Sequence, residues 1–216
     1  MSSAPARGRR APTPERIEKQ RVEREQILRA AFRLIGRSNV TTSVHEILDE
    51  AELSTRAFYR HFESKDELIL TMCRTAGERV AERLAKAIAA ADGPAAALEA
   101  WVHQYLAVAH EPRRVRQSTV LTSAEARAAV GFDALREEGA RARRELLARV
   151  IREGHRRGEL PGAKDPEEDA RAVASVVEGL IQARLAGEPG PSWAEATAHT
   201  TELFLRAFGA RPRRRR

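Results

Sequence analysis

Residues 43–68 carry the side chains whose types and spacing could do the most specific chemistry. Ser54, Thr55 and Arg56 open a short predicted helix over 55–61, and Tyr59 follows one turn later. Hydroxyl, guanidinium, imidazole and ammonium groups donate hydrogen bonds both to phosphate oxygens and to base edges of DNA. The candidate DNA contacts are Ser43, Ser54, Thr55, Arg56, Tyr59, Arg60, His61 and Lys65.

Three helix caps position these donors. Ser43 with Glu46 forms a capping-box pattern that predicts a helix over 44–51. Ser54 caps the helix over 55–61, and a second capping-box pattern at Ser64 begins a long helix at residue 65. A short helix, a tight turn and a second short helix are typical of a helix-turn-helix, whose second helix enters a DNA major groove about 12 Å wide.

The remaining pattern predicts an all-α fold of about nine helices. Further helices are expected over 14–36, 94–110 and 124–156, the last bent near Gly131, with a short one from Pro112 and two more from Pro166 and Trp193. The expected organisation is a disordered basic arm (1–13), a three-helix helix-turn-helix DNA-binding domain (14–68), a larger helical ligand-binding and dimerisation domain (69–209) and a basic tail (210–216).

The order of residues through this region resembles the DNA-binding domain of the TetR family. The resemblance covers about residues 27–72, through Ile27–Ala31, Ser43–Ile47, Leu53–Phe62 and Ser64–Leu68. Its most specific part is the ending Tyr-x-His-Phe-x-Ser-Lys-x-x-Leu, which begins at Tyr59. The rest of the chain is similar to the family only in its size and its helical order.

The chain departs from the family pattern at three places. Glu52 stands where the family often has glycine, and a left-handed backbone at a residue with a Cβ costs about 1 kcal/mol, so we expect a slightly different turn. Arg56-Ala57 stands where Gly-Thr is common, which makes Arg56 the expected base reader. The loop before residue 43 lacks the usual glycine and has Asn39 nearby.

The resemblance implies a homodimer that binds a palindromic operator in double-stranded DNA, usually as a repressor, and that a small-molecule effector releases. It also implies that the last two long helices pair with their mates in a second copy. The apolar face from Val173 is wider than one neighbouring helix needs, although a monomeric core explains it as well. Expected interface residues are Val173, Val176, Val177, Leu180 and Phe204. Expected ligand contacts are Trp101 and Tyr105, an aromatic pair that a core position also explains.

Composition narrows the remaining possibilities. The net charge of +7 is concentrated in two arginine-rich ends, because the eight arginines within 1–12 and 211–216 have no acidic neighbour there, and the rest of the basic residues nearly balance the 31 acidic ones. Such ends suit nucleic acid, although they are also explained as solubilising tails. One cysteine, Cys73, and no long apolar run indicate a cytoplasmic protein without a disulfide framework or a membrane span.

Two other classes of function stay open on the residues alone. A helical-bundle enzyme is disfavoured, because no nucleophile, phosphate-loop or zinc motif occurs, and we expect no catalytic residue, metal or cofactor. The pairs Glu99/His103 and Glu195/His199 have i, i+4 spacing but not the Glu-x-x-His pattern of di-iron bundles. A helical adaptor that does not bind DNA is the third possibility, and sequence-specific DNA retention separates it from the first.

Overall fold

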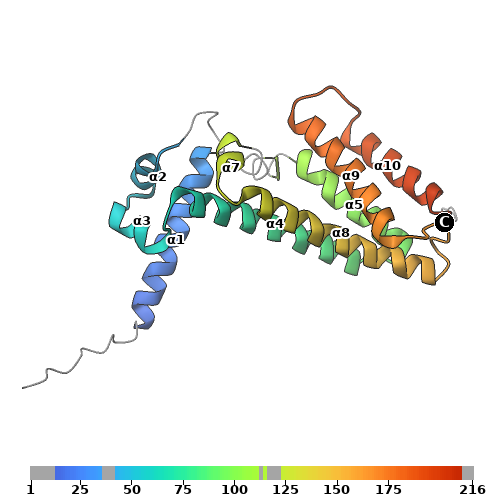
Figure 1. Cartoon of the computed structure of the whole chain (residues 1–216), viewed down its shortest axis with the longest axis horizontal. Coiled ribbons are helices and arrows are strands. Elements are labelled where there is room, and N and C mark those ends of the chain that lie inside the picture. The colour runs from blue at the N-terminus through green and yellow to red at the C-terminus, as the bar shows by residue number, and fades with distance from the viewer. Residues whose placement is uncertain (1–12, 36–41, 112–113, 116–122, 211–216) are drawn as a thin grey trace, which may run out of the picture. The chain divides into compact units, whose positions relative to one another are not determined.

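The computed structural model describes residues 13–35, 42–111, 114–115 and 123–210, and every regular element in these ranges is helical. The predicted all-α fold class is therefore confirmed (Figure 1). The elements are α1 (Pro14–Ile35), α2 (Val44–Ala51), α3 (Thr55–His61), α4 (Lys65–Ala89), α5 (Pro94–Leu106), the 3-10 helix η1 (Ala107–Ala109), α7 (Ala124–Ala128), α8 (Phe132–Arg156), α9 (Pro166–Leu185) and α10 (Trp193–Ala207).

Two predicted helices end differently in the structure. The helix expected over 124–156 is divided into α7 and α8, because Ala129 is extended and Gly131 takes a left-handed backbone with φ of 95°. The helix expected over 94–110 ends at Leu106 and tightens into η1. The two arms, the loop at 36–41 and most of the short helix expected from Pro112 lie outside the described residues.

The chain divides between Leu68 and Ile69 into two compact units. In the N-terminal unit, α1 packs against α2 and α3. Ile27, Ile47, Phe58, Phe62 and Leu68 are fully or almost fully buried between these helices. This small core fixes the direction of α3, whose other side is left exposed.

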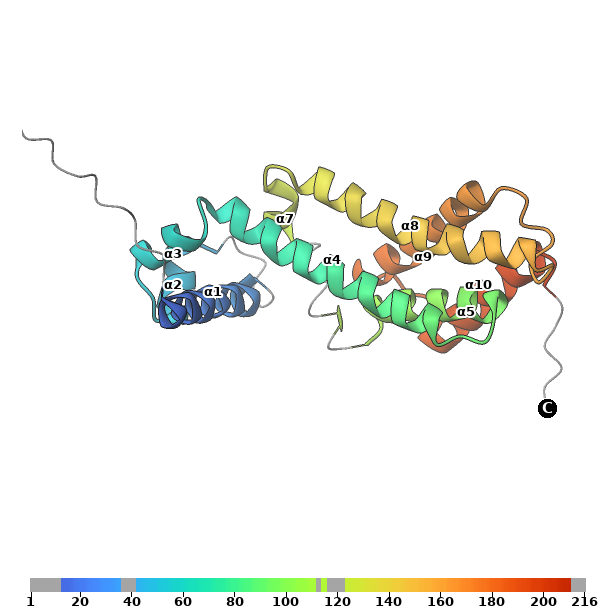
Figure 2. The ribbon, with the colours of Figure 1, turned by 90° about the horizontal axis from the view of Figure 1, so that it is seen from below.

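The C-terminal unit is a helical body in which α8 packs on α9 and α5, and α5 also packs on α10 (Figures 1 and 2). Its core includes Leu98, Trp101, Leu147, Ile151 and Val173, each without exposed surface. Within the part of the chain that is described, no helix is both long and apolar enough to span a bilayer.

Candidate DNA-binding surface and ligand cavity

The turn between α2 and α3 keeps a left-handed residue although that residue is a glutamate. Glu52 has φ 55° and ψ 40°, and its N–H donates to the carbonyls of Asp49 and Leu48. The N–H of Leu53 donates to the carbonyl of Leu48 at 3.0 Å. These paired bonds are a Schellman ending, which usually has glycine at the left-handed position. The expectation of a different turn is therefore wrong: the hydrogen bonds that close α2 hold Glu52 in the conformation that glycine would take.

The two sides of α3 differ sharply in exposure. Ala57 and Phe58 are buried against the core, whereas Thr55, Arg56 and Tyr59 are exposed, Tyr59 with 61% of its surface. The Tyr59 ring packs edge-on against Phe58, with ring centroids 5.3 Å apart. Because Phe58 is fixed in the core, the phenol of Tyr59 is held by its inner edge while its outer part faces solvent.

The two predicted serines, Ser43 and Ser54, cap the N-termini of α2 and α3. Ser43 and Glu46 form the predicted capping box at the start of α2, and Ser54 Oγ accepts from Ala57 N–H at 3.3 Å. Both serines are exposed. Lys65 begins α4 as predicted and is half-buried. These three residues therefore lie at helix N-termini, where backbone N–H groups favour an anion.

Arg60 and His61 are held from behind by a glutamate that the sequence reading missed. Oε2 of Glu23 accepts from Arg60 Nη1 at 2.6 Å and lies 3.1 Å from His61 Nε2. The side chains of His61 and Glu23 are only 7% and 10% exposed, and that of Arg60 is 40% exposed. The hydrogen bond with His61, reinforced by Arg60, keeps the pKa of Glu23 below its ordinary value in spite of burial. A signal existed, because Glu23 lies one turn before Ile27 on the buried face of α1.

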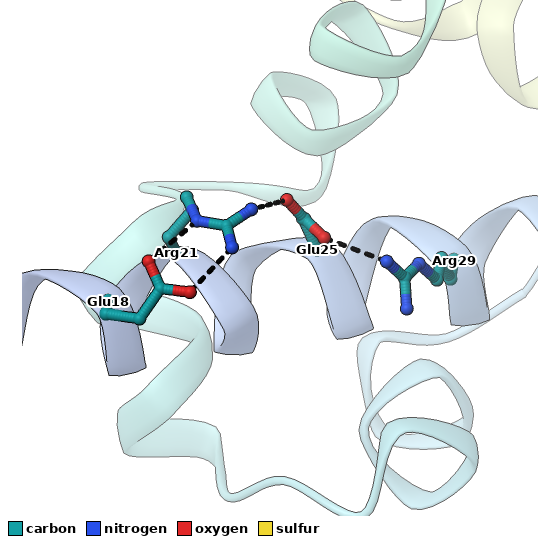
Figure 3. Close-up of polar contacts among 4 residues, drawn as sticks. All are labelled: Glu18, Arg21, Glu25 and Arg29. Atoms are coloured by element: carbon teal, nitrogen blue, oxygen red, sulfur yellow. Dashed lines mark hydrogen bonds and ion pairs between the residues drawn. The ribbon is translucent and has the colours of Figure 1, made fainter.

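The outer face of α1 carries a ladder of alternating charges (Figure 3). Arg21 bonds to both Glu18 and Glu25, and Glu25 also accepts from Arg29 at 2.8 Å. Spacings of three and four residues stabilise an isolated helix by a few tenths of a kcal/mol per pair, about 0.2–0.5 kcal/mol. The ladder thus supports the exposed face of the middle of α1, and its two arginines are already paired with carboxylates.

The C-terminal unit contains a cavity of about 320 Å³. Residues from α4, α5, η1, α8 and α9 form its wall, among them the buried Val80, Tyr105, Phe132 and Ile181. This volume lies at the small end of the range for ligand sites, roughly 300–1,000 Å³, and mostly apolar walls are typical of such sites. The cavity is therefore suited to a compact ligand with an apolar body.

The two predicted ligand contacts are placed differently with respect to this cavity. Tyr105 lines it and donates its hydroxyl to Glu178 Oε1 at 2.9 Å. Trp101 has no exposed surface and packs edge-on against Tyr105, with ring centroids 5.1 Å apart. Trp101 is thus a core residue behind the cavity wall, not part of the lining.

Cys73 also lines the cavity as a neutral thiol. Burial raises its pKa to about 11. A thiol needs its thiolate form to act as a nucleophile or metal ligand, so Cys73 is a small apolar wall residue at neutral pH. Among the described residues, no three His, Cys, Asp or Glu side chains gather where they could hold a metal ion.

The residues expected at a dimer interface are divided between core and surface. Val173, Val177 and Phe204 are buried within the protomer. Val176 is 42% exposed, and Leu180 is partly buried against the core. A Cβ added at the exposed Gly179 would meet no atom within 4 Å. The exposed surface of α9 that a partner could contact is therefore a stripe through Val176 and Gly179, bordered by Leu180. This stripe is narrower than the apolar face expected from the sequence.

A protein-family match covers α2, α3 and their surroundings in the N-terminal unit. Residues 27–72 match the family described as "Bacterial regulatory proteins, tetR family". This range contains α2, α3 and the part of α1 from Ile27 onward, but not Glu23. No curated protein matches the chain.

Solved structures share the whole fold. A transcriptional regulator from Rhodococcus sp. Rha1 superposes with a TM-score of 0.69 at 24% identity, covering 88% of this chain and 99% of the other. A putative transcriptional regulator from Saccharomonospora viridis, in complex with choline, has a TM-score of 0.71 at 22% identity, covering 83% and 94%. AibR, in complex with isovaleryl coenzyme A and operator DNA, has a TM-score of 0.63 at 14% identity, covering 85% and 98%.

The sequence match indicates one family, the shared fold is consistent with it, and the matched residues include the exposed face of α3. The chain carries at residues 27–72 the DNA-binding domain of the TetR family of bacterial transcriptional regulators, joined to a C-terminal helical domain in a TetR-like fold.

Proposed function

We propose that the protein is a dimeric repressor that binds a palindromic operator through α3 and releases it when a small molecule enters the cavity of the C-terminal unit. The observation that carries this proposal is the face of α3, where Thr55, Arg56 and Tyr59 are exposed beside a fully buried Phe58. A helix that is anchored on one side and presents donors on the other is suited to the major groove.

The donors divide into two roles in this proposal. Arg56, in the first turn of α3, reads a base edge, for which a guanidinium that binds guanine through two hydrogen bonds is well suited. Tyr59, Lys65, Ser43 and the N-terminal residues of α3 contact phosphates. His61 and Arg60 both contact Glu23, and His61 positions α3 through this contact. Arg60 is the more exposed of the two.

A second copy of the chain supplies the second reading helix. An inverted repeat requires two α3 helices about one DNA turn apart, ~34–36 Å, or a multiple of it. The exposed stripe on α9 supports pairing there, because the small residue Gly179 lets another backbone approach and Val176 offers apolar surface. Leu203 of α10, 41% exposed, is a further exposed apolar residue of the same unit.

Helix α4 connects the ligand to the DNA in this proposal. It begins at Lys65 in the N-terminal unit, and six of its later residues, between Cys73 and Ala81, line the cavity. A ligand that contacts this segment can favour a placement of α4 that the operator does not accept. By thermodynamic linkage, operator DNA must then weaken ligand binding by the same factor by which the ligand weakens operator binding.

The test is selection of binding sites from a pool of random duplex DNA, followed by affinity measurements on the selected site. We expect an enriched inverted repeat, and an Arg56→Ala affinity for it lower by about 5–150-fold, which corresponds to a bidentate base contact of ~1–3 kcal/mol. Arg29→Ala is the matched control, because Arg29 lies in the same unit but is engaged in the ladder of α1. No enriched site, or equal losses in the two variants, would refute the proposal.

A further inference from the structure

Arg143 is the one charged residue among those described in the cavity wall that is not exposed. Its side chain is 14% exposed, whereas Arg74, Glu78, Arg136 and Glu138 are all exposed. Arg143 comes from α8, between the inward-facing Ala140 and Leu147. A guanidinium at such a position has to find hydrogen-bond acceptors, because a buried charge without partners is strongly destabilising.

The protein itself satisfies this guanidinium incompletely. Nη2 lies 3.4 Å from Glu178 Oε1, longer than the usual ~2.7–2.9 Å of a charge-assisted bond. The same Oε1 already accepts the hydroxyl of Tyr105 at 2.9 Å. Nε of Arg143 is buried and has no hydrogen-bond partner among the described residues. Nε is therefore covered by the surrounding protein, and Nη2, whose bond to Glu178 is long, keeps donor capacity for a ligand.

The remaining surroundings favour an anion over a cation. The guanidinium carbon of Arg143 lies 5.1 Å from the centroid of the Tyr105 ring and over its face, the position that an aromatic site would offer to a cationic ligand. Burial raises the pKa of Tyr105, so its phenol stays neutral and adds no negative charge. A carboxylate matches the planar edge of a guanidinium with two parallel hydrogen bonds.

Two helical glycines widen the cavity next to this group. A Cβ at Gly139 would stand 3.2 Å from Arg143 Nη1, so the glycine leaves room for the guanidinium. A Cβ at Gly77, on α4, would meet no atom within 4 Å. Glycine inside a helix is destabilising relative to alanine. Packing between protein groups gives no reason for Gly77, and the open space in front of it is the cavity.

We propose that the effector of this protein is a small organic carboxylate with an apolar body, whose carboxylate binds the terminal Nη nitrogens of Arg143 while its body fills the space between Val80, Phe132 and Ile181. This inference rests on the proposed function, in which the cavity is the effector site. Glu178 competes with the ligand for Arg143, and it links Arg143 on α8 with Tyr105 on α5 and with its own helix α9. Binding therefore alters the contacts of α9.

The experiment measures ligand-induced thermal stabilisation and Kd of the full-length protein with a matched panel. The probes are straight-chain carboxylates from butanoate to dodecanoate and 3-phenylpropanoate, each with its primary amide and its trimethylammonium counterpart. We expect one or more carboxylates to stabilise the protein, with their amides and ammonium counterparts much weaker. Arg143→Met should raise the Kd of the best carboxylate about tenfold or more, as expected for a hydrogen bond to a charged group.

Two further variants separate ligand recognition from a structural role of Arg143. Glu178→Gln removes the competing charge, so it should tighten carboxylate binding and leave amide binding unchanged. Arg141→Met, on the same helix but 68% exposed and outside the cavity wall, should leave the Kd unchanged. If Arg143→Met does not fold, Gly139→Ala takes its place, because the added methyl displaces Nη1 and should weaken carboxylate binding although it favours the helix.

The inference is overturned if no carboxylate stabilises the protein, if an amide or ammonium probe binds as well, or if Arg143→Met and Gly139→Ala both keep the affinity of the wild type. The proposed function is judged separately, by the selection of DNA sites without ligand. An enriched inverted repeat together with failure of every carboxylate would reject the effector class alone.

Discussion

Replacing Glu23 with Gln tests how the reading helix is held in place. The substitution keeps the volume of the side chain and removes its charge. In the native unit, Oε2 of Glu23 accepts a hydrogen bond from Arg60 Nη1 at 2.6 Å and lies 3.1 Å from His61 Nε2. Arg60 and His61 are 37 and 38 residues away from Glu23 along the chain. They join the middle of α1 to the last turn of α3.

The size of the effect follows from the exposure of the partners. Removing one member of a fully buried ion pair costs about 3–5 kcal/mol. Arg60 is 40% exposed and recovers hydration, whereas His61 at 7% does not. The glutamine carbonyl also keeps one of the two bonds. We therefore expect a loss of ~1–2 kcal/mol in the stability of the N-terminal unit, toward the lower end of the ~1.5–3 kcal/mol that one hydrogen bond to a charged group contributes.

Residue-resolved amide hydrogen exchange measures this loss where it occurs. Protection of α1 and α3 amides should fall about tenfold, and protection of α9 amides should stay unchanged, because α9 belongs to the other unit. Glu18→Gln is the matched control on the same helix, since Glu18 is exposed in the ladder of Figure 3 and should show no measurable change. Equal protection of α3 in the two variants would refute the anchoring role of Glu23.

The pH dependence has a definite sign. Because the folded-state pKa of Glu23 is lowered, its carboxylate stabilises the fold at pH values above the unfolded-state pKa, about 4.3. This contribution is lost as the pH falls from that value through the lower folded-state pKa. The difference between wild type and Glu23→Gln should therefore be complete at pH 7 and should shrink below about pH 4. A difference that grows on acidification would contradict the assignment.

Three other predictions concern the turn, the DNA and the dimer. Glu52→Gly should stabilise the N-terminal unit by up to ~1 kcal/mol in urea denaturation because it relieves the left-handed strain, whereas Glu52→Ala, which keeps a Cβ, should not. Lys65→Ala should weaken binding to the selected operator and to random DNA alike and reduce the salt slope by roughly one unit in fluorescence-anisotropy titrations; a loss confined to the operator would exclude a phosphate contact. Val176→Glu should give a monomer in sedimentation and abolish operator binding, and a dimer that still footprints would remove α9 from the interface.

The sequence alone settles much of the local structure. The capping box at Ser43 and the N-cap at Ser54 are confirmed, and α2 and α3 have the predicted bounds. These features involve residues three or four positions apart, so their hydrogen bonds form within one helical turn and can be read from spacing. The match at residues 27–72 depends on the same local order.

Local rules failed where a neighbouring element decided the outcome. Glu52 has an unfavourable conformation for a residue with a Cβ, but the bonds to Leu48 and Asp49 and the packing of α2 and α3 on α1 keep the turn. The reading of 124–156 as one bent helix underestimated Gly131, whose positive φ begins a new helix rather than bending the old one.

The sequence determined which donors α3 carries, and the tertiary structure decided which of them face outward. Arg56 and Tyr59 are exposed, whereas His61 is covered and bound to Glu23 of α1. The cavity and its guanidinium likewise arise only when α4, α5, α8 and α9 come together, because Arg143 and Glu178 lie 35 residues apart. Helix periodicity assigns a residue to a face, but the partner that compensates a buried charge comes from a distant segment, and only the folded chain brings the two together.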